Sequence, residues 1–210
     1  MTDYANSKPE ELPWPQAGDQ LFVSAEDAEN NAWLKWRGEA KWWAYAEGYR
    51  KAADVLVEGS TETLSDQDFL VYPISFLYRH YLELRLKGLI MVGSQLVRID
   101  QGFPPCHDIQ KLWKEARTIL EQVWPSGPKA DLDNVETSIR EFAAIDPQSY
   151  AFRYPSTKDG KEHLPTLTHI NLRNLSEVMG RLAGLLDSAL DGMLQMLRMR
   201  REAKEDYLGY

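Results

Sequence analysis

The polar residues with the clearest chemical potential lie together in one short segment, residues 78–87. His80, Glu83 and Lys87 are three and four residues apart, so a helix places them on one face. Arg79 precedes Glu83 by four residues and can pair with it in the same way. On an exposed helix such pairs contribute about 0.3–0.5 kcal/mol each. In a buried setting every charge needs a partner. The segment is therefore either a solvated helix flank or a specific, partly buried ligand cluster.

A second candidate site lies where residues 105–108 precede an apolar helical pattern. Asp108 is expected in the first turn of this helix, close to its N-terminal cap. His107 is expected beside this cap. A capping role and a role in ligand binding both remain open for the pair.

A third candidate is Arg153, which stands between two aromatic residues in the irregular segment 146–168. Loops of this length commonly carry function. The guanidinium can present a planar donor pair to a phosphate, or it can fix the loop to a helix carboxylate such as Glu83. Both interpretations stay open.

Several kinds of chemistry have no motif in the sequence. The four histidines and the single cysteine, Cys106, lack metal-ligand spacing, so no metal or cofactor is expected. One cysteine also excludes an internal disulfide. A phosphate-binding glycine loop and a GxSxG nucleophile elbow are both absent. A familiar hydrolase or NTPase is therefore not expected.

The elements that must position these residues are helices, because the apolar residues recur at i, i+3, i+4 and i+7. The fold class predicted is all-α, an up-and-down bundle of about five long helices. Pro73 is expected to kink the second helix or to mark a restart within it. The helices are predicted over residues 24–58, 65–96, 107–123, 129–144 and 169–201.

The first predicted helix is rich in aromatic residues, which form two neighbouring stripes. One stripe is predicted to be buried in the core, and the second to contact a partner or a twin subunit. A platform for stacking nucleobases is the alternative. The stripes consist of Trp33, Trp36, Ala40, Trp43 and Ala44, and of Trp42, Tyr45, Tyr49, Ala52 and Leu56.

Length and composition predict an irregular arm over residues 1–23 and one helical domain over residues 24–205. The polar start of the chain does not have the pattern of a secretory signal, and no apolar run is long enough to span a membrane. A cytoplasmic location without membrane contact is expected. The net charge of −8 argues against non-specific binding of nucleic acid, yet it permits a small basic pocket.

Three segments together resemble HEPN-like proteins. Residues 72–90 are similar to the HEPN helix that carries a Glu and a Lys four residues apart. Residues 106–113 look like the start of the following helix, and residues 152–155 resemble an Arg-Tyr-Pro element found in many members. The order and the spacing match over about residues 65–197.

The resemblance implies an all-α bundle that dimerises and has a cleft at the dimer interface. Many relatives act on RNA in prokaryotic defence, toxin or RNA-processing systems. Catalytic members carry an Arg, four to six residues and then a His. Here Arg153 precedes His163 by ten positions and Arg98 precedes His107 by nine. A non-catalytic member that binds RNA or a nucleotide, or that serves as a scaffold, is therefore expected equally with a ribonuclease.

For a ribonuclease, a metal-independent attack by an RNA 2′-OH is the expected route. Arg153 is predicted to steady the phosphate and His107 to move the proton. Glu83 and Lys87 are predicted to position them, and Arg79, His80 and Asp108 to complete the ligand site. The alternative is a structural or regulatory helical dimer that acts through a protein partner.

Overall fold

The computed structural model describes residues 14–15, 17–24, 26–99 and 104–208. The chain divides into two units, residues 1–36 and residues 37–210, which are treated separately. In the first unit the described residues are irregular except for a 3₁₀ turn at Ala28–Asn30. Residues 1–13 of the expected arm lie outside the described residues.

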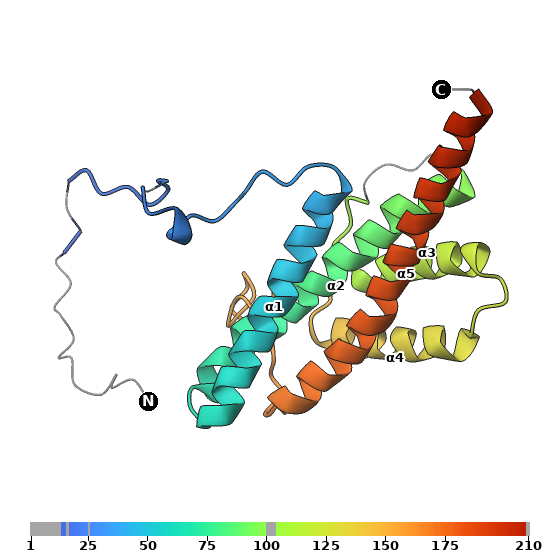
Figure 1. Ribbon diagram of the computed structural model, residues 1–210. Helices are drawn as coiled ribbons and strands as arrows, with labels where there is room; N and C mark the ends of the chain where they lie inside the picture. Colours follow the sequence, from blue (N-terminus) through green and yellow to red (C-terminus); the bar gives the residue numbers. More distant parts are fainter. Residues whose placement is uncertain (1–13, 16, 25, 100–103, 209–210) are drawn as a thin grey trace. The chain divides into compact units, whose positions relative to one another are not determined.

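The second unit consists of five packed α-helices (Figure 1). No β-strand occurs in the described part of the chain, where a single bridge joins Ser156 and Glu162. The all-α prediction is confirmed. The helices are α1 (Glu39–Thr63), α2 (Gln67–Val97), α3 (Ile109–Val123), α4 (Lys129–Ile145) and α5 (Leu172–Leu208).

The expected start of the first helix is wrong, because α1 begins at Glu39 instead of residue 24. Gly38 precedes it with φ of +56°, a left-handed conformation that favours glycine. Trp33 and Trp36 come before the helix, and Trp43 is 44% exposed, so the predicted buried stripe does not form. The buried residues of α1 are Ala46, Ala53, Val57 and Ser60. α1 packs against α2, and Trp43 and Tyr45 remain exposed at the surface.

α2 is the central helix, and it packs against α1, α3 and α5 (Figure 1). Every residue from Tyr81 to Ile90 is buried, so this stretch contacts protein on all sides. α2 is continuous through Pro73, which is exposed in the second turn. The expected restart at Pro73 does not occur.

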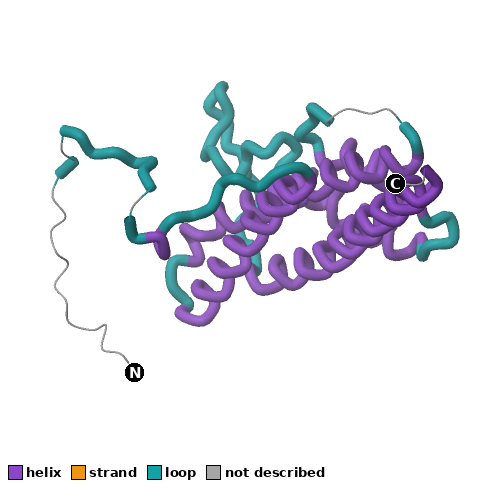
Figure 2. Tube along the Cα trace, turned by 45° about the horizontal axis from the view of Figure 1, so that its top comes forward, coloured by secondary structure: helices purple, strands orange, loops and turns teal. Residues whose placement is uncertain are grey.

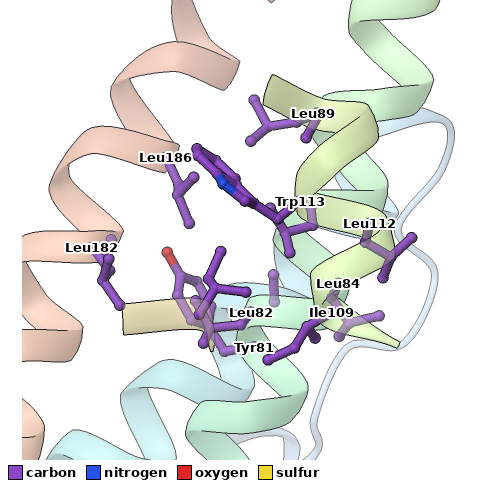
Figure 3. Close-up of a cluster of buried hydrophobic side chains, with 14 of the residues drawn as sticks. Tyr81, Leu82, Leu84, Leu89, Ile109, Leu112, Trp113, Leu182 and Leu186 are labelled. Atoms are coloured by element: carbon purple, nitrogen blue, oxygen red, sulfur yellow. The ribbon is translucent and has the colours of Figure 1, made fainter. Parts of the chain in front are cut away.

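The core lies where α2, α3 and α5 meet (Figure 3). Trp113 of α3 lies here near Leu89 of α2 and Leu186 of α5. The buried residues of α3 are Ile109, Leu112, Trp113, Ala116, Ile119 and Leu120. On α5 the buried residues include Leu172, Met179, Leu182, Leu186, Leu190, Met193 and Leu197, while Leu175 is half-buried.

The connection between α4 and α5, residues 146–171, is loop throughout (Figure 2). It contains turns and the Ser156–Glu162 bridge. α3, α4 and this connection bring the candidate residues near α2. Within the described residues no helix is both long and apolar enough to cross a bilayer.

Candidate functional site

The centre of the candidate site is a buried charge network on α2. Oε2 of Glu83 accepts a hydrogen bond from Nη1 of Arg79 at 3.1 Å, and Oε1 accepts one from Nζ of Lys87 at 2.9 Å. The side chains of Arg79, Glu83 and Lys87 are 0%, 2% and 4% exposed. The interpretation of residues 78–87 as a solvated helix flank is therefore excluded. The charges are buried and paired, as the alternative interpretation requires.

Arg79 also holds two neighbouring segments against α2. Its Nη2 donates to the carbonyl oxygen of His107 at 2.6 Å, and its Nε donates to the carbonyl oxygen of Asp146 at 3.3 Å. These carbonyls lie at the start of α3 and at the end of α4. A single buried guanidinium thus fixes the two places from which the other site residues project.

Asp146 continues this arrangement into the loop. It ends α4 and is 1% exposed, and its Oδ1 accepts hydrogen bonds from the backbone N–H groups of Tyr150 and Ala151 at 2.8 and 3.1 Å. These bonds form the turn that carries Arg153. The other carboxylate oxygen of Asp146, Oδ2, is buried without a hydrogen-bond partner among the described residues.

His107 extends from the start of α3 to the same carboxylate. Its Nδ1 lies 2.8 Å from Oε1 of Glu83, while its side chain is 71% exposed. Asp108 is the N-cap of α3, and its Oδ1 accepts from the N–H groups of Gln110 and Lys111 at 3.0 and 3.2 Å. The capping interpretation of Asp108 is therefore correct, and the cap orients His107.

The network keeps Glu83 ionised. Burial by itself raises the pKa of this carboxyl, but hydrogen bonds from Lys87 and His107 and their charges outweigh burial and lower the pKa below its ordinary value. Because an ionised carboxylate can only accept hydrogen bonds, Nδ1–H of His107 donates to Glu83, and in the uncharged tautomer of this ring Nε2 carries the lone pair. An exposed imidazole of this kind can accept a proton from a ligand.

His80 lies on the same face of α2 in an aromatic setting. Its ring is edge-on to Tyr49, with centroids 4.4 Å apart, and is stacked on Phe76 at 5.7 Å. Burial lowers the pKa of His80, and the charges of Arg79, Lys87 and Arg153 act in the same direction while Glu83 opposes them. His80 is therefore neutral at physiological pH.

Arg153 is exposed and is held by aromatic rings. Its guanidinium carbon lies 5.4 Å from the centroid of Phe76, 4.9 Å from that of Tyr150 and 5.6 Å from that of Tyr154. Its Nε donates to the carbonyl oxygen of Ser149. In the described residues it makes no ion pair with a carboxylate. Of the two interpretations left open for Arg153, the one in which it pins the loop to Glu83 is wrong, because Arg79 occupies that carboxylate.

These contacts bring the predicted residues onto one side of α2. Phe76, His80 and Glu83 follow one another along a single helix face. Arg153 lies over Phe76, and His107 is hydrogen-bonded to Glu83. Phe76 and Glu83 are seven residues apart, so Arg153 and His107 are separated by roughly 10 Å along the helix axis. The face carries a cation at one end and an imidazole at the other, with neutral His80 between them.

Sequence reasoning missed Asp146, Phe76 and Tyr150. The position of Asp146 at the end of a predicted helix and just before a proline is a turn signal, but it does not indicate contact with Arg79. A second buried network was also missed. In it, Asp187 of α5 accepts a hydrogen bond from the Tyr81 hydroxyl at 2.8 Å and lies 2.7 Å from Nε of Arg85.

The site has no evident metal chemistry. Within the described residues no group of three or more His, Cys, Asp or Glu side chains is placed to hold a metal ion. The geometry offers proton transfer at His107 and anion binding at Arg153.

Comparison with known protein families, with curated proteins and with solved structures finds no match to this chain.

Proposed function

We propose that this is a HEPN-like helical protein, of the prokaryotic defence or toxin type, that binds RNA or a nucleotide on the face of α2 that carries His107, His80 and Arg153. The observation that carries the proposal is the hydrogen bond between His107 and Glu83. A buried, ionised carboxylate orients an imidazole that is otherwise exposed. Such an arrangement fixes the tautomer of a proton-transfer group.

Arg153 supports the same proposal. Stacking on three rings holds its charge in a fixed position at the surface, and its two terminal nitrogens form no hydrogen bond within the described part of the chain. A planar guanidinium with free in-plane donors matches phosphate oxygens. The surrounding exposed tyrosines offer surfaces for base stacking.

If the bound RNA is cleaved, the chain supplies a metal-independent route. The 2′-OH loses its proton to Nε2 of His107 as its oxygen forms a bond to phosphorus. The bond from phosphorus to the 5′-oxygen breaks, and the departing oxygen takes a proton from the imidazolium or from water. Arg153 balances the charge that develops on the phosphate. The products are a 2′,3′-cyclic phosphate and a 5′-hydroxyl end.

The test is to incubate the purified protein with tRNA and single-stranded RNA in EDTA, at low and at high salt. Retention and cleavage are measured for wild type, His107→Gln and Arg153→Ala. Arg181→Ala is the matched control, because it removes an exposed arginine of α5. We expect RNA binding by wild type to weaken as the salt concentration rises. Of the two arginine variants, only Arg153→Ala should bind RNA more weakly than wild type. Equal binding by Arg153→Ala and Arg181→Ala would reject the proposal.

A second candidate function is a structural or regulatory helical dimer that acts through a protein partner. The observation in its favour is that α1 carries three exposed apolar or aromatic side chains, since Trp43, Tyr45 and Val55 are 44%, 53% and 66% exposed. The test is analytical ultracentrifugation over a wide concentration range. A dimer that dissociates in Trp43→Glu, together with no salt-sensitive RNA binding, would favour this candidate.

A further inference from the structure

A cleft of about 770 Å³ lies beside Arg153, between the beginning of α2 and the α4–α5 connection. Residues 67–72 of α2 supply one wall, and residues 151–156 and 162–170 supply the other. A volume of this size is in the range of small-molecule sites, which is about 300–1,000 Å³. The cleft is separate from the His107–Glu83 pair, and Arg153 lines it.

The walls of the cleft carry aromatic surface. Tyr72 projects from α2 and Tyr154 from the loop, and they are 50% and 52% exposed. Exposed rings on both walls suit a flat, aromatic ligand, since stacking tolerates any nucleobase.

The charges of the cleft are uneven. Among the described residues that line it, Arg153 is the one Lys or Arg, whereas Asp68 and Glu162 each add a carboxylate. A single cation can match one phosphate, and the carboxylates repel further anionic groups. Carboxylates are good acceptors for ribose hydroxyls and for base amino groups. A ligand with one anionic end and a neutral, hydrogen-bonding remainder fits this distribution.

We propose that the cleft binds one nucleoside monophosphate unit, with the base and ribose between Tyr72 and Tyr154 and the phosphate at Arg153. This rests on the proposed function in one respect, because Arg153 would hold the same phosphate that His107 approaches. A nucleoside triphosphate fits less well, since its additional charges would meet Asp68 and Glu162.

The unit has two sources, a free nucleotide or one residue of an RNA strand. A neighbouring hollow of about 470 Å³ shares Gln67, His169 and Ile170 with the cleft and continues to Arg173. This continuation offers space for a second unit of a strand.

Calorimetric titration of the full chain tests the proposal. The probes are the four nucleoside 5′-monophosphates, the matching nucleosides, ATP and a single-stranded hexaribonucleotide. The variants are Tyr72→Ala, Tyr72→Phe and Tyr154→Ala. Tyr45→Ala is the matched control, because Tyr45 is 53% exposed on α1 and lines no part of the cleft.

We expect the monophosphates to bind more tightly than either the nucleosides or ATP. Tyr72→Ala and Tyr154→Ala should each weaken this binding about tenfold, whereas Tyr72→Phe and Tyr45→Ala should leave it within twofold. A hexaribonucleotide that binds at least tenfold more tightly than the monophosphates identifies a strand as the source, and equal affinity identifies a free nucleotide.

The proposal is overturned if wild type binds no monophosphate, or if both alanine variants bind it as wild type does. RNA binding that persists in those variants would reject the cleft as the nucleotide site but would leave the function proposed above standing. Monophosphate binding that depends on Tyr72, without any RNA cleavage, would retain the cleft and reject the ribonuclease.

Discussion

The imidazole of His107 is 71% exposed, yet its Nδ1 lies 2.8 Å from a carboxylate oxygen of Glu83, which is 2% exposed. The bond therefore joins a surface group to the interior of the bundle. It connects the orientation of His107 to the charges of α2, because Glu83 also pairs with Arg79 and Lys87. Stability and site geometry depend on the same carboxylate.

Glu83→Gln should destabilise the protein strongly. The change leaves Arg79 and Lys87 buried without their shared counter-charge, and breaking a buried pair costs about 3–5 kcal/mol. Urea denaturation would measure the loss. Glu177→Gln, at an exposed position of α5, should stay within the error of the measurement. Adding Lys87→Met to Glu83→Gln should recover part of the stability, and additive losses would contradict this coupling.

His80 should make stability fall as the solution becomes acidic. Its pKa is lower in the folded state than the ordinary value of about 6.5, so the unfolded chain binds the proton first. Stability is therefore highest above about pH 6.5 and decreases as the pH drops through that value. The pKa of Glu83 is also lowered, but its contribution is lost only in more acidic solution.

Urea denaturation of wild type and His80→Phe between pH 8 and pH 5.5 checks this expectation. Phenylalanine keeps a ring between Tyr49 and Phe76 but cannot titrate. The variant should show a flatter profile in this range. Parallel profiles would show that His80 does not cause the pH dependence.

The helices were predictable because their apolar periodicity is strong, as on α3 and α5. The start of α1 was not, because Trp33 and Trp36 continue the helical spacing although Gly38 turns the chain before Glu39. In the site, the ion pairs of Glu83 with Arg79 and Lys87 follow from helical spacing. The bonds from Arg79 to the carbonyl groups of His107 and Asp146 join residues 28 and 67 positions apart, and local patterns carry no such information.

Asp146→Ala should loosen the turn that carries Arg153. The variant loses the acceptor for the N–H groups of Tyr150 and Ala151, and removing such a cap costs about 0.5–2 kcal/mol. Hydrogen exchange at these two amides should accelerate, and salt-sensitive RNA binding should weaken. Asp146→Asn retains an oxygen acceptor and should lie nearer to wild type. Unchanged exchange in Asp146→Ala would contradict the capping role.

Arg153→Lys should weaken RNA binding although it keeps the charge. An ammonium lacks the planar group that stacks on Phe76, Tyr150 and Tyr154, so its position is less fixed. We expect the affinity to lie between those of wild type and Arg153→Ala in filter-binding assays at several salt concentrations. Full affinity in the lysine variant would show that charge alone is sufficient.

Gly93→Ala tests the closeness of α2 to α3. A Cβ atom at this position would overlap Ile119 Cγ2 and lie 3.2 Å from Met193 Sδ, so the core must shift. Overpacking of this kind costs about 1–3 kcal/mol. Gly184→Ala is the control, since an added Cβ meets nothing within 4 Å and should stabilise α5 by about 0.5–1 kcal/mol. Thermal unfolding would compare the two, and equal shifts would contradict the close approach.

The ten consecutive buried residues of α2 also limit how this chain can change over generations. Between Tyr81 and Ile90 no position faces water, so each replacement alters either packing or charge pairing. The outer faces of α1, α4 and α5 are free of this constraint. The sequences of homologues should therefore diverge over most of their length while they retain this one segment. α2 is the part of the chain by which distant homologues would be recognised.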